Sequence, residues 1–245
     1  MAVNRKRGGE RPAQASEAGA ASAPREPVTR ERVLEAAVAL ADAEGVEALT
    51  MRRLGRALGV EAMSLYNHVA NKDDVLDGMV GRVTSELGAI QGEDGWRAGL
   101  GQRARATYRM LLRHPWASTL IESRKNPIPA RTRACDQVLG LLRAGGFSLR
   151  AAYHAFLILD SYVYGFALQE VSWPTDKEEL PAAIEAYQRV IPAATYPHVA
   201  AMMEHVLAER TGAEGPPDDT DYAPEFEVGL ELVLEGLERL RSQID

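Results

Sequence analysis

From residue 29 onward, apolar positions recur with the period of a helix in most segments of the 245-residue chain. In the first such segment Val33, Ala37 and Leu40 recur at spacings of three and four, which is typical of a helix with one buried face. Thr29 before the segment is a suitable N-cap, and Gly45 after it is a suitable end. No segment keeps the strict alternation of a half-buried strand, so we expect an all-α fold.

The stretch Leu49 to Lys72 is the most informative part of the chain. Its pattern predicts a short helix capped by Thr50 and closed by a glycine, followed at once by a second helix over Ala62 to Val69. The second helix would bury Leu65 and Val69 and turn small, hydroxyl, phenol and amide groups outward, namely Ala62, Met63, Ser64, Tyr66 and Asn67. Such groups suit the edges of base pairs in a major groove.

Groups that could bind phosphates flank this pair of helices. Arg52 and Arg53 open the first helix, and Asn71 with Lys72 opens the helix that follows the pair. The backbone N–H groups and dipole at that helix start also favour an anion. On spacing alone, two helices joined at a glycine also occur in many soluble helical proteins, so the pattern leaves an ordinary helical pair open.

The remaining pattern predicts further helices separated by Pro- and Gly-containing breaks. We expect them at 72–87, Trp96–Arg113, a short segment after Pro115, 129–142, Phe147–Val171, 181–191, 196–210 and Ala223–Ile244. Arg103, Arg105 and Arg109 should form a solvated or salt-bridged face of the helix that begins at Trp96.

Two of these helices suit an interface between subunits. Phe147–Val171 is apolar nearly all round, and Ala223–Ile244 repeats large apolar residues at three and four, so each should be buried on more than one side. Two such helices from each of two chains would form a four-helix bundle, and we expect a homodimer. The alternative is the ordinary core of a monomer.

The chain divides into three parts on this basis. Residues 1–28 have almost no large apolar groups and read as a disordered basic tail, whose Arg5, Lys6, Arg7 and Arg11 either add nonspecific DNA contacts or only face solvent. Residues 29–87 form the unit with the helix pair, which spans about 50–71, and residues 88–245 form a larger helical unit.

The charge is distributed unevenly along the chain. The net charge is −7, but residues 1–72 carry 11 Lys and Arg against 9 Asp and Glu, whereas residues 73–245 carry 17 against 26. The acidic character therefore lies in the second part, as expected if only the first approaches nucleic acid. Cys135 is the only cysteine, and no apolar run is long enough to span a bilayer or to form a secretory signal. We expect a soluble cytoplasmic protein that does not bind a membrane.

The motifs of common enzymes are missing from the sequence. No nucleophile elbow, phosphate-binding glycine loop or paired-cysteine motif occurs, so we expect no catalytic residues and no cofactor. His198 and His205 share a helix face but have no cysteine or carboxylate at a suitable spacing, so we expect no metal site.

A ligand pocket between helices is a better candidate. Such pockets are mainly apolar with a few polar anchors. The apolar helix and its neighbours carry aromatic and polar residues that could line one: Trp96, Tyr108, His114, Trp116, Tyr153, Phe156, Asp160 and Tyr164. The alternative is that the polar groups among them satisfy one another across the dimer.

The helix pair resembles the DNA-binding domain of the TetR family of transcriptional regulators. The matching positions are Leu49, Thr50, Arg52, Leu54, Gly59, Val60, Leu65, Tyr66, His68, Val69, Asn71 and Lys72. The sequences GFSL at 146–149 and FEVGLELVLEGLERL at 226–240 are similar to the dimerising and ligand-sensing domain of the tetracycline-repressor branch.

The resemblance implies a homodimeric repressor that binds a palindromic operator and is released by a small-molecule effector. It implies backbone contacts from Tyr66, His68 and Lys72, with Ala62, Met63 and Ser64 at base edges. Arg52, together with Thr50 and Asn67, would also reach DNA. The positions that hold a magnesium–tetracycline complex in that branch have no match here, so tetracycline recognition is not implied.

Two other functions stay open at this point. One is a DNA-binding protein whose second unit only dimerises and senses nothing. The other is an enzyme built on the same helical fold, although no set of residues predicts it.

Overall fold

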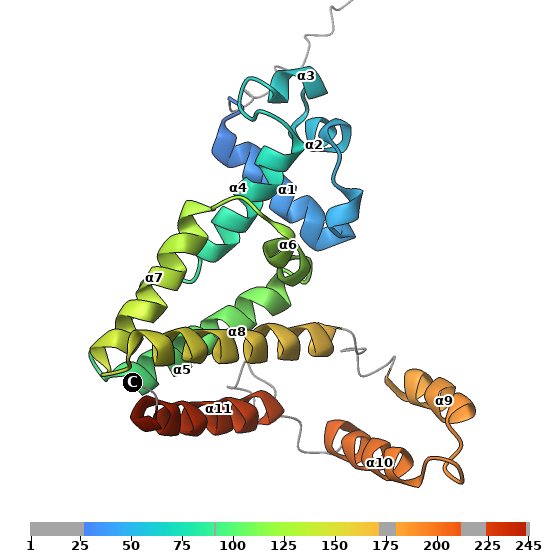
Figure 1. Cartoon of the computed structure of the whole chain (residues 1–245). Helices are drawn as coiled ribbons and strands as arrows, with labels where there is room; N and C mark the ends of the chain where they lie inside the picture. Colours follow the sequence, from blue (N-terminus) through green and yellow to red (C-terminus); the bar gives the residue numbers. More distant parts are fainter. Residues whose placement is uncertain (1–26, 91, 172–179, 212–223, 244–245) are drawn as a thin grey trace, which may run out of the picture.

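The computed structural model describes residues 27–90, 92–171, 180–211 and 224–243, and every regular element in these ranges is helical. The N-terminal unit contains α1 (Arg30–Glu44), the 3₁₀ turn η1 (Val46–Ala48), α2 (Met51–Leu58), α3 (Ala62–Leu65) and α4 (Lys72–Ser85). The C-terminal unit contains α5 (Trp96–Arg113), α6 (Ala117–Ser123), α7 (Pro129–Ala144), α8 (Leu149–Val171), α9 (Leu180–Val190), α10 (Pro197–Thr211) and α11 (Pro224–Gln243). Figure 1 shows α4 leading from the first unit into the second. The all-α fold is confirmed.

Helix ends largely follow the capping signals in the sequence. The Thr29 hydroxyl accepts from the amide of Arg32 and begins α1, and the Thr50 hydroxyl accepts from the amide of Arg53 and begins α2. Ser148 likewise accepts from the amide of Ala151 at the start of α8. Each of these caps satisfies an amide that has no partner within its own helix.

The second helix of the pair is shorter than predicted. The prediction ran to Val69, but α3 ends at Leu65, and the chain continues in tight turns in which His68 donates its amide to Leu65 three residues earlier. Leu65 and Val69 are nonetheless both buried, as expected. Burial of these two side chains in the apolar core fixes the segment without a continuous helix.

Two glycines set the angle between α2 and α3. Gly59 ends α2 with φ 69°, in the left-handed region that favours glycine. Gly55 faces α3, and a Cβ there would lie 2.9 Å from the carbonyl oxygen of Val60 and 3.1 Å from the amide nitrogen of Ala62. The backbone of α3 therefore approaches α2 more closely than any side chain would allow.

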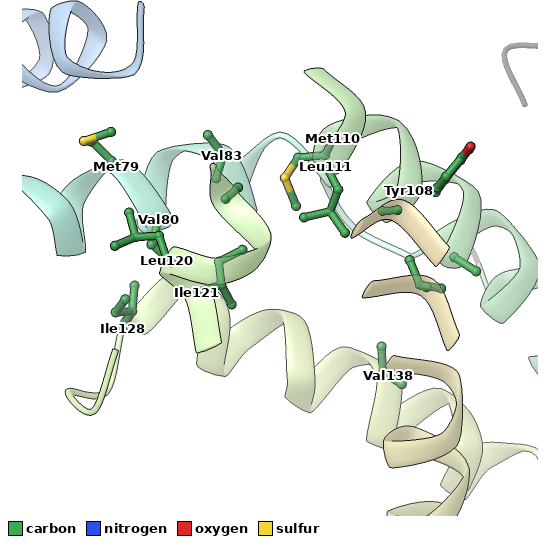
Figure 2. Close-up of a cluster of buried hydrophobic side chains, with 14 of the residues drawn as sticks. Met79, Val80, Val83, Tyr108, Met110, Leu111, Leu120, Ile121, Ile128 and Val138 are labelled. Atoms are coloured by element: carbon green, nitrogen blue, oxygen red, sulfur yellow. The ribbon is translucent and has the colours of Figure 1, made fainter. Parts of the chain in front are cut away.

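The C-terminal unit is centred on α5, α8 and α11, which pack against one another. Tyr108 of α5 stacks on Phe226 of α11 with ring centroids 4.2 Å apart, and the hydroxyl of Tyr162 on α8 donates to the Phe226 carbonyl at 2.6 Å. Figure 2 shows the apolar core continuing through α6 into α4, where Leu120 and Ile121 lie near Val80 and Val83. The two units thus share one buried cluster.

The arginines of α5 differ from the predicted solvated or salt-bridged face. Arg105 is salt-bridged as expected, through Nη2 to Glu227 of α11 at 2.7 Å. Arg103 is instead buried, with 7% of its surface exposed, and donates to the Gly88 carbonyl and to Gln137. The helix turns this arginine toward α7 because α7 covers that side of α5. The Arg103 prediction was therefore wrong.

Several predictions fall outside the described residues. These are the basic tail at 1–28, of which only the last two residues are described, and most of the two loops at 172–180 and 211–222.

Alanine at two helical glycines should have opposite effects on stability. Gly140 of α7 is exposed, and nothing lies within 4 Å of the place that a Cβ would take, whereas a Cβ at Gly55 would meet backbone atoms. We expect Gly140→Ala to raise the free energy of unfolding by about 0.5–1 kcal/mol through helix propensity, and Gly55→Ala to lower it by about 1–3 kcal/mol through steric overlap. Urea unfolding of both variants checks this, and a stabilised Gly55→Ala protein would show that the close approach is not a constraint.

Candidate DNA-binding surface and ligand site

The outward side of the α2–α3 pair is an exposed surface of mixed chemistry. Met63 is 75% exposed and Tyr66 is 45% exposed, although both are large hydrophobic side chains. Asn67 is also exposed, while Ala62 and Ser64 are partly buried. The structure therefore brings the predicted base-contacting residues to one surface, supported from below by the buried Leu65.

Cations surround this surface. Arg52, Arg56 and Lys72 are exposed, and none of them forms an ion pair within the described residues. Arg53, the other predicted phosphate contact, is paired with Glu44 of α1. Unpaired cations can neutralise phosphates without first breaking an internal contact.

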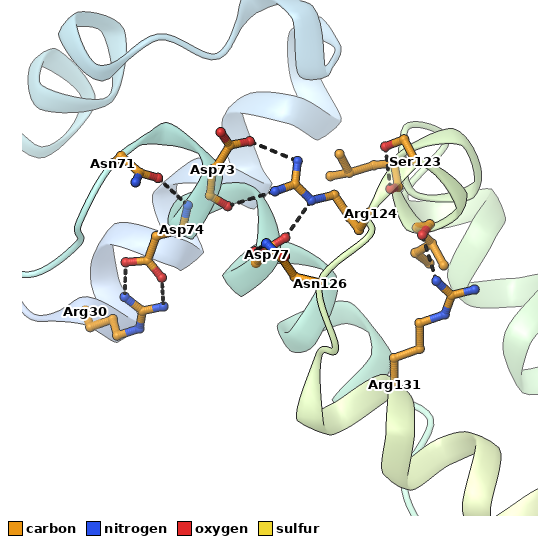
Figure 3. A network of polar contacts seen from close by, with 11 residues as sticks. Arg30, Asn71, Asp73, Asp74, Asp77, Ser123, Arg124, Asn126 and Arg131 are labelled. Atoms are coloured by element: carbon orange, nitrogen blue, oxygen red, sulfur yellow. Dashed lines mark hydrogen bonds and ion pairs between the residues drawn. The ribbon is translucent and has the colours of Figure 1, made fainter.

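Contacts at the start of α4 hold the N-terminal unit together. Asn71 caps α4 by accepting from the amide of Asp74, so Asn71 acts as a cap in this structure. Asp74 forms a two-point contact with Arg30 of α1, at 2.6 and 2.8 Å, and also accepts from the amide of Ala70 (Figure 3). The pKa of Asp74 is lowered mainly by its hydrogen bond with Arg30. Arg30 also reaches the carbonyl of His68 at 3.4 Å, which ties the turn after α3 to α1.

The N-terminal unit is anchored to the C-terminal unit at the beginning of α6. One oxygen of Asp42, near the end of α1, lies 2.8 Å from Nδ1 of His114 and accepts from the indole N–H of Trp116 at 2.7 Å. The other imidazole nitrogen of His114 lies 3.4 Å from Glu86 at the end of α4. His114 and Trp116 are both buried, whereas the carboxylates of Asp42 and Glu86 stay in contact with solvent.

A second anchor lies at the other end of α6. Arg124, which directly follows α6, contacts Asp73 at 3.0 Å and Asp77 at 2.5 Å on α4, and Asn126 donates to Asp77 at 3.3 Å (Figure 3). The pKa of Arg124 is raised, with the hydrogen bond to Asp77 as the largest cause. Both ends of this seven-residue helix are therefore attached to the N-terminal unit.

The eight predicted ligand residues lie in different places. Trp96 packs edge-on against Phe147 at 4.9 Å, and Tyr108 belongs to the stack on α11. His114 and Trp116 bind Asp42, and Tyr153 is 56% exposed on the outer side of α8. Only three of the eight share one helix face, because they recur at intervals of four on α8: Phe156, Asp160 and Tyr164.

Asp160 and Tyr164 form a polar cluster with Glu122 of α6 and with Arg131 and Cys135 of α7. The pKa of Asp160 is raised to about 6, mainly by burial and also by the charge of Glu122, while Arg131 acts in the opposite direction. Burial also raises the pKa of the Tyr164 phenol. Both residues are only partly buried by surface area, so solvent reaches them although protein atoms surround them closely.

Sequence reasoning missed the carboxylates and the arginine of the two anchors, and it gave His114 and Trp116 a ligand role instead. Asp42, Asp73, Asp77 and Arg124 lie on separate elements, and the partners are 47 to 74 positions apart in the chain. Helical periodicity does not indicate which residues so far apart in the chain come into contact. The one available signal was the high density of acidic residues at the start of α4.

Within the described ranges, no helix is long and apolar enough to cross a membrane. The same ranges contain no group of three or more His, Cys, Asp and Glu side chains that could hold a metal ion.

Comparison with known proteins matches both units to one family. Residues 33–79 match the model for bacterial regulatory proteins of the tetR family, and residues 89–241 match the tetracyclin repressor-like C-terminal domain. The HTH-type transcriptional repressor DrrR1 of Streptomyces coeruleorubidus is 36% identical over 230 residues, which cover 90% of this chain and 81% of that protein.

Solved structures agree with this match. A possible TetR family transcriptional regulator from Streptomyces coelicolor A3(2) superposes with a TM-score of 0.67 at 30% identity, covering 86% of this chain and all of that one. The Streptomyces coelicolor TetR family protein ActR in complex with actinorhodin also gives a TM-score of 0.67, at 29% identity, covering 89% of this chain and all of that one.

Because the pKa of Asp160 is raised, we expect Asp160→Asn to increase the free energy of unfolding by an amount that depends on pH. A pKa raised from 3.8 to about 6 means that the folded state holds this proton more tightly than the unfolded state does. Protonated Asp160 therefore contributes its full stabilisation below about pH 4, and this stabilisation is lost as the pH rises through about 6. The amide should therefore raise the free energy of unfolding by up to about 3 kcal/mol near pH 7.5 and change it little near pH 4.

Urea unfolding at both pH values measures this difference. The control is Asp136→Asn, at an exposed carboxylate on α7. An equal effect of Asp160→Asn at the two pH values would contradict the assigned burial.

Proposed function

The chain belongs to the TetR family of transcriptional regulators, and we propose that it is a homodimeric repressor that leaves a palindromic operator when a small molecule binds between α6, α7 and α8. The observation that carries the DNA-binding part is the exposed α2–α3 surface, where Met63 and Tyr66 face solvent beside unpaired cations. Because such a regulator acts on chromosomal DNA, we propose the cytoplasm as its compartment.

The composition of the surface supports a division of roles. Met63, with Ala62 and Ser64, would contact base edges, and apolar groups of this kind suit the methyl group of thymine. Tyr66, Lys72 and Arg52 would contact the sugar–phosphate backbone, with Thr50, Asn67 and His68 beside them. The exposure of Met63, Tyr66 and Asn67 supports these assignments, as does the absence of ion pairs at Arg52 and Lys72 within the described residues.

Exposed apolar side chains on α8 and α11 support the dimer. Leu149, Tyr153 and Leu157 recur every four residues on α8 and are 41–71% exposed, and Val228 and Leu232 on α11 are 64% and 65% exposed. The two helices pack side by side, so the exposed residues extend over both (Figure 1). A surface of this kind on a water-soluble chain marks a contact with another protein, and we assign it to a second copy.

The anchors of α6 support a coupling route. A ligand that displaces α6 must also displace Asp42 of α1 or Asp73 and Asp77 of α4, because these residues bind the two ends of that helix. The ligand can shift the arrangement of the two N-terminal units only by as much as it prefers one arrangement over the other. ActR has been seen in complex with actinorhodin, and we propose an organic effector for this chain as well.

Tyr66→Ala should weaken operator binding, while Tyr196→Ala should not. Tyr66 is 45% exposed on the proposed DNA surface, and Tyr196 is 49% exposed at the start of α10, far along the chain from it. We expect a loss of about tenfold or more for Tyr66→Ala, since a lost backbone contact weakens binding on every sequence. Fluorescence anisotropy on the DNA beside the gene measures this, with a scrambled duplex as reference. Equal binding to both duplexes, or equal loss in both variants, would contradict the proposal.

A charge in the proposed dimer interface should separate the subunits. Leu157→Glu buries a carboxylate without a partner if α8 is an interface, and we expect a monomer at micromolar concentration. Met63→Glu, an equally drastic change at a 75% exposed residue of the N-terminal unit, should stay dimeric and lose DNA binding. Size-exclusion chromatography with light scattering gives both masses. A dimeric Leu157→Glu protein would place the interface elsewhere.

A further inference from the structure

The polar cluster between α6, α7 and α8 holds two groups that a ligand could bind without displacing a protein partner. Neither the carboxylate of Asp160 nor the phenol of Tyr164 has a hydrogen-bond partner within the described residues, although burial is the main influence on the pKa of each. Solvent still reaches both groups, but their partial burial disfavours the charged form of Asp160, and a bound cation would offset that cost. The two residues are one helical turn apart, so a single bound group could reach both.

The cations near Asp160 are engaged elsewhere. Figure 3 shows Arg131 donating to a backbone carbonyl, that of Ile121 at 2.9 Å. Arg131 also donates to Glu122 at 2.8 Å, so its charge is matched by that carboxylate. Arg103, beyond Cys135, donates to the Gly88 carbonyl and to Gln137. With Glu122 and Arg131 cancelling, Asp160 leaves the cluster with one uncompensated negative charge.

Aromatic rings flank this carboxylate on both sides along α8. Phe156 lies one turn before Asp160 and Tyr164 one turn after it, and both rings are partly buried against the core. The face of an aromatic ring attracts a cation, and the attraction grows when water is excluded. A carboxylate between two rings is therefore suited to an ammonium or amidinium group, and poorly suited to an anion.

We propose that the effector is a cationic amine on a flat apolar body, and that its protonated nitrogen pairs with Asp160 while Phe156 and Tyr164 pack against it. This inference rests on the proposed function, since it names the chemical class of the effector. Tyr164 would orient the amine through its hydroxyl. The anchors of α6 lie outside this site and would transmit binding without touching the ligand.

Three probes with one ring system and different charges test this proposal. They are 9-(aminomethyl)anthracene, 9-anthracenemethanol and 9-anthracenecarboxylate, which are cationic, neutral and anionic near neutral pH. Binding to the full-length protein is followed by probe fluorescence anisotropy without DNA. We expect the amine to bind at least about tenfold more tightly than the alcohol, and the carboxylate to bind most weakly.

Asp160→Asn tests the assigned partner. This variant keeps the shape of the side chain and removes its charge, so the preference for the amine over the alcohol should fall to within about twofold. Asp136→Asn, at an exposed carboxylate of α7, should retain the full preference. Tyr164→Phe should weaken binding of the amine by about threefold and leave binding of the alcohol nearly unchanged.

The outcomes separate this inference from the proposed function. Equal binding of amine and alcohol, an unchanged preference in Asp160→Asn, or no binding of the amine up to about 1 mM would overturn the amine site. Operator binding is measured on the same preparation. Intact, sequence-specific operator binding together with any of those results leaves the repressor in place and removes only the proposed effector class.

Discussion

The hydrogen bonds that Asp42 receives from His114 and Trp116 are the constraint on which the arrangement of the two units depends. A single carboxylate oxygen near the end of α1 binds two buried side chains just before α6. Arg124 fastens the other end of α6 to α4. Because both ends are held, α6 and the N-terminal unit are expected to move together. The exposed α2–α3 surface is thereby connected to the C-terminal unit.

The interior of the C-terminal unit retains charges that a simple core would exclude. Asp160 stays in surroundings that raise its pKa to about 6, and one nitrogen of the buried Arg103 has no partner among the described residues. Each costs stability that an apolar residue would not. A chain that needs only a dimerising core has no physical use for an unpaired carboxylate there. We propose that this carboxylate lowers the stability of the free protein and strengthens the binding of a ligand.

Local features of this molecule were predictable from the sequence because their causes are local. The caps at Thr29, Thr50 and Ser148 and the glycine end of α2 follow from rules that span four residues, and the structure has all of them. The end of α3 was not predictable, since Leu65 and Val69 suit either a helix or the tight turns that the chain adopts. The burial of Arg103 and the anchors of α6 depend on which helices pack together, which periodicity does not encode. For the ligand site, the spacing of four residues places Phe156, Asp160 and Tyr164 on one helix face. Trp96 was included only because of its residue type, and it packs elsewhere.

If the anchors of α6 fix how the two N-terminal units are placed in the proposed dimer, the distance between those units should depend on the anchors. Double electron–electron resonance between spin labels at Glu47→Cys, an exposed site of η1, measures this distance in a Cys135→Ser background. We expect one narrow distance distribution in that background. The distribution should become broad or shifted when Asp42→Ala and Arg124→Ala remove the two anchors. An equally narrow distribution at the same distance in the anchor variants would contradict the role given to α6.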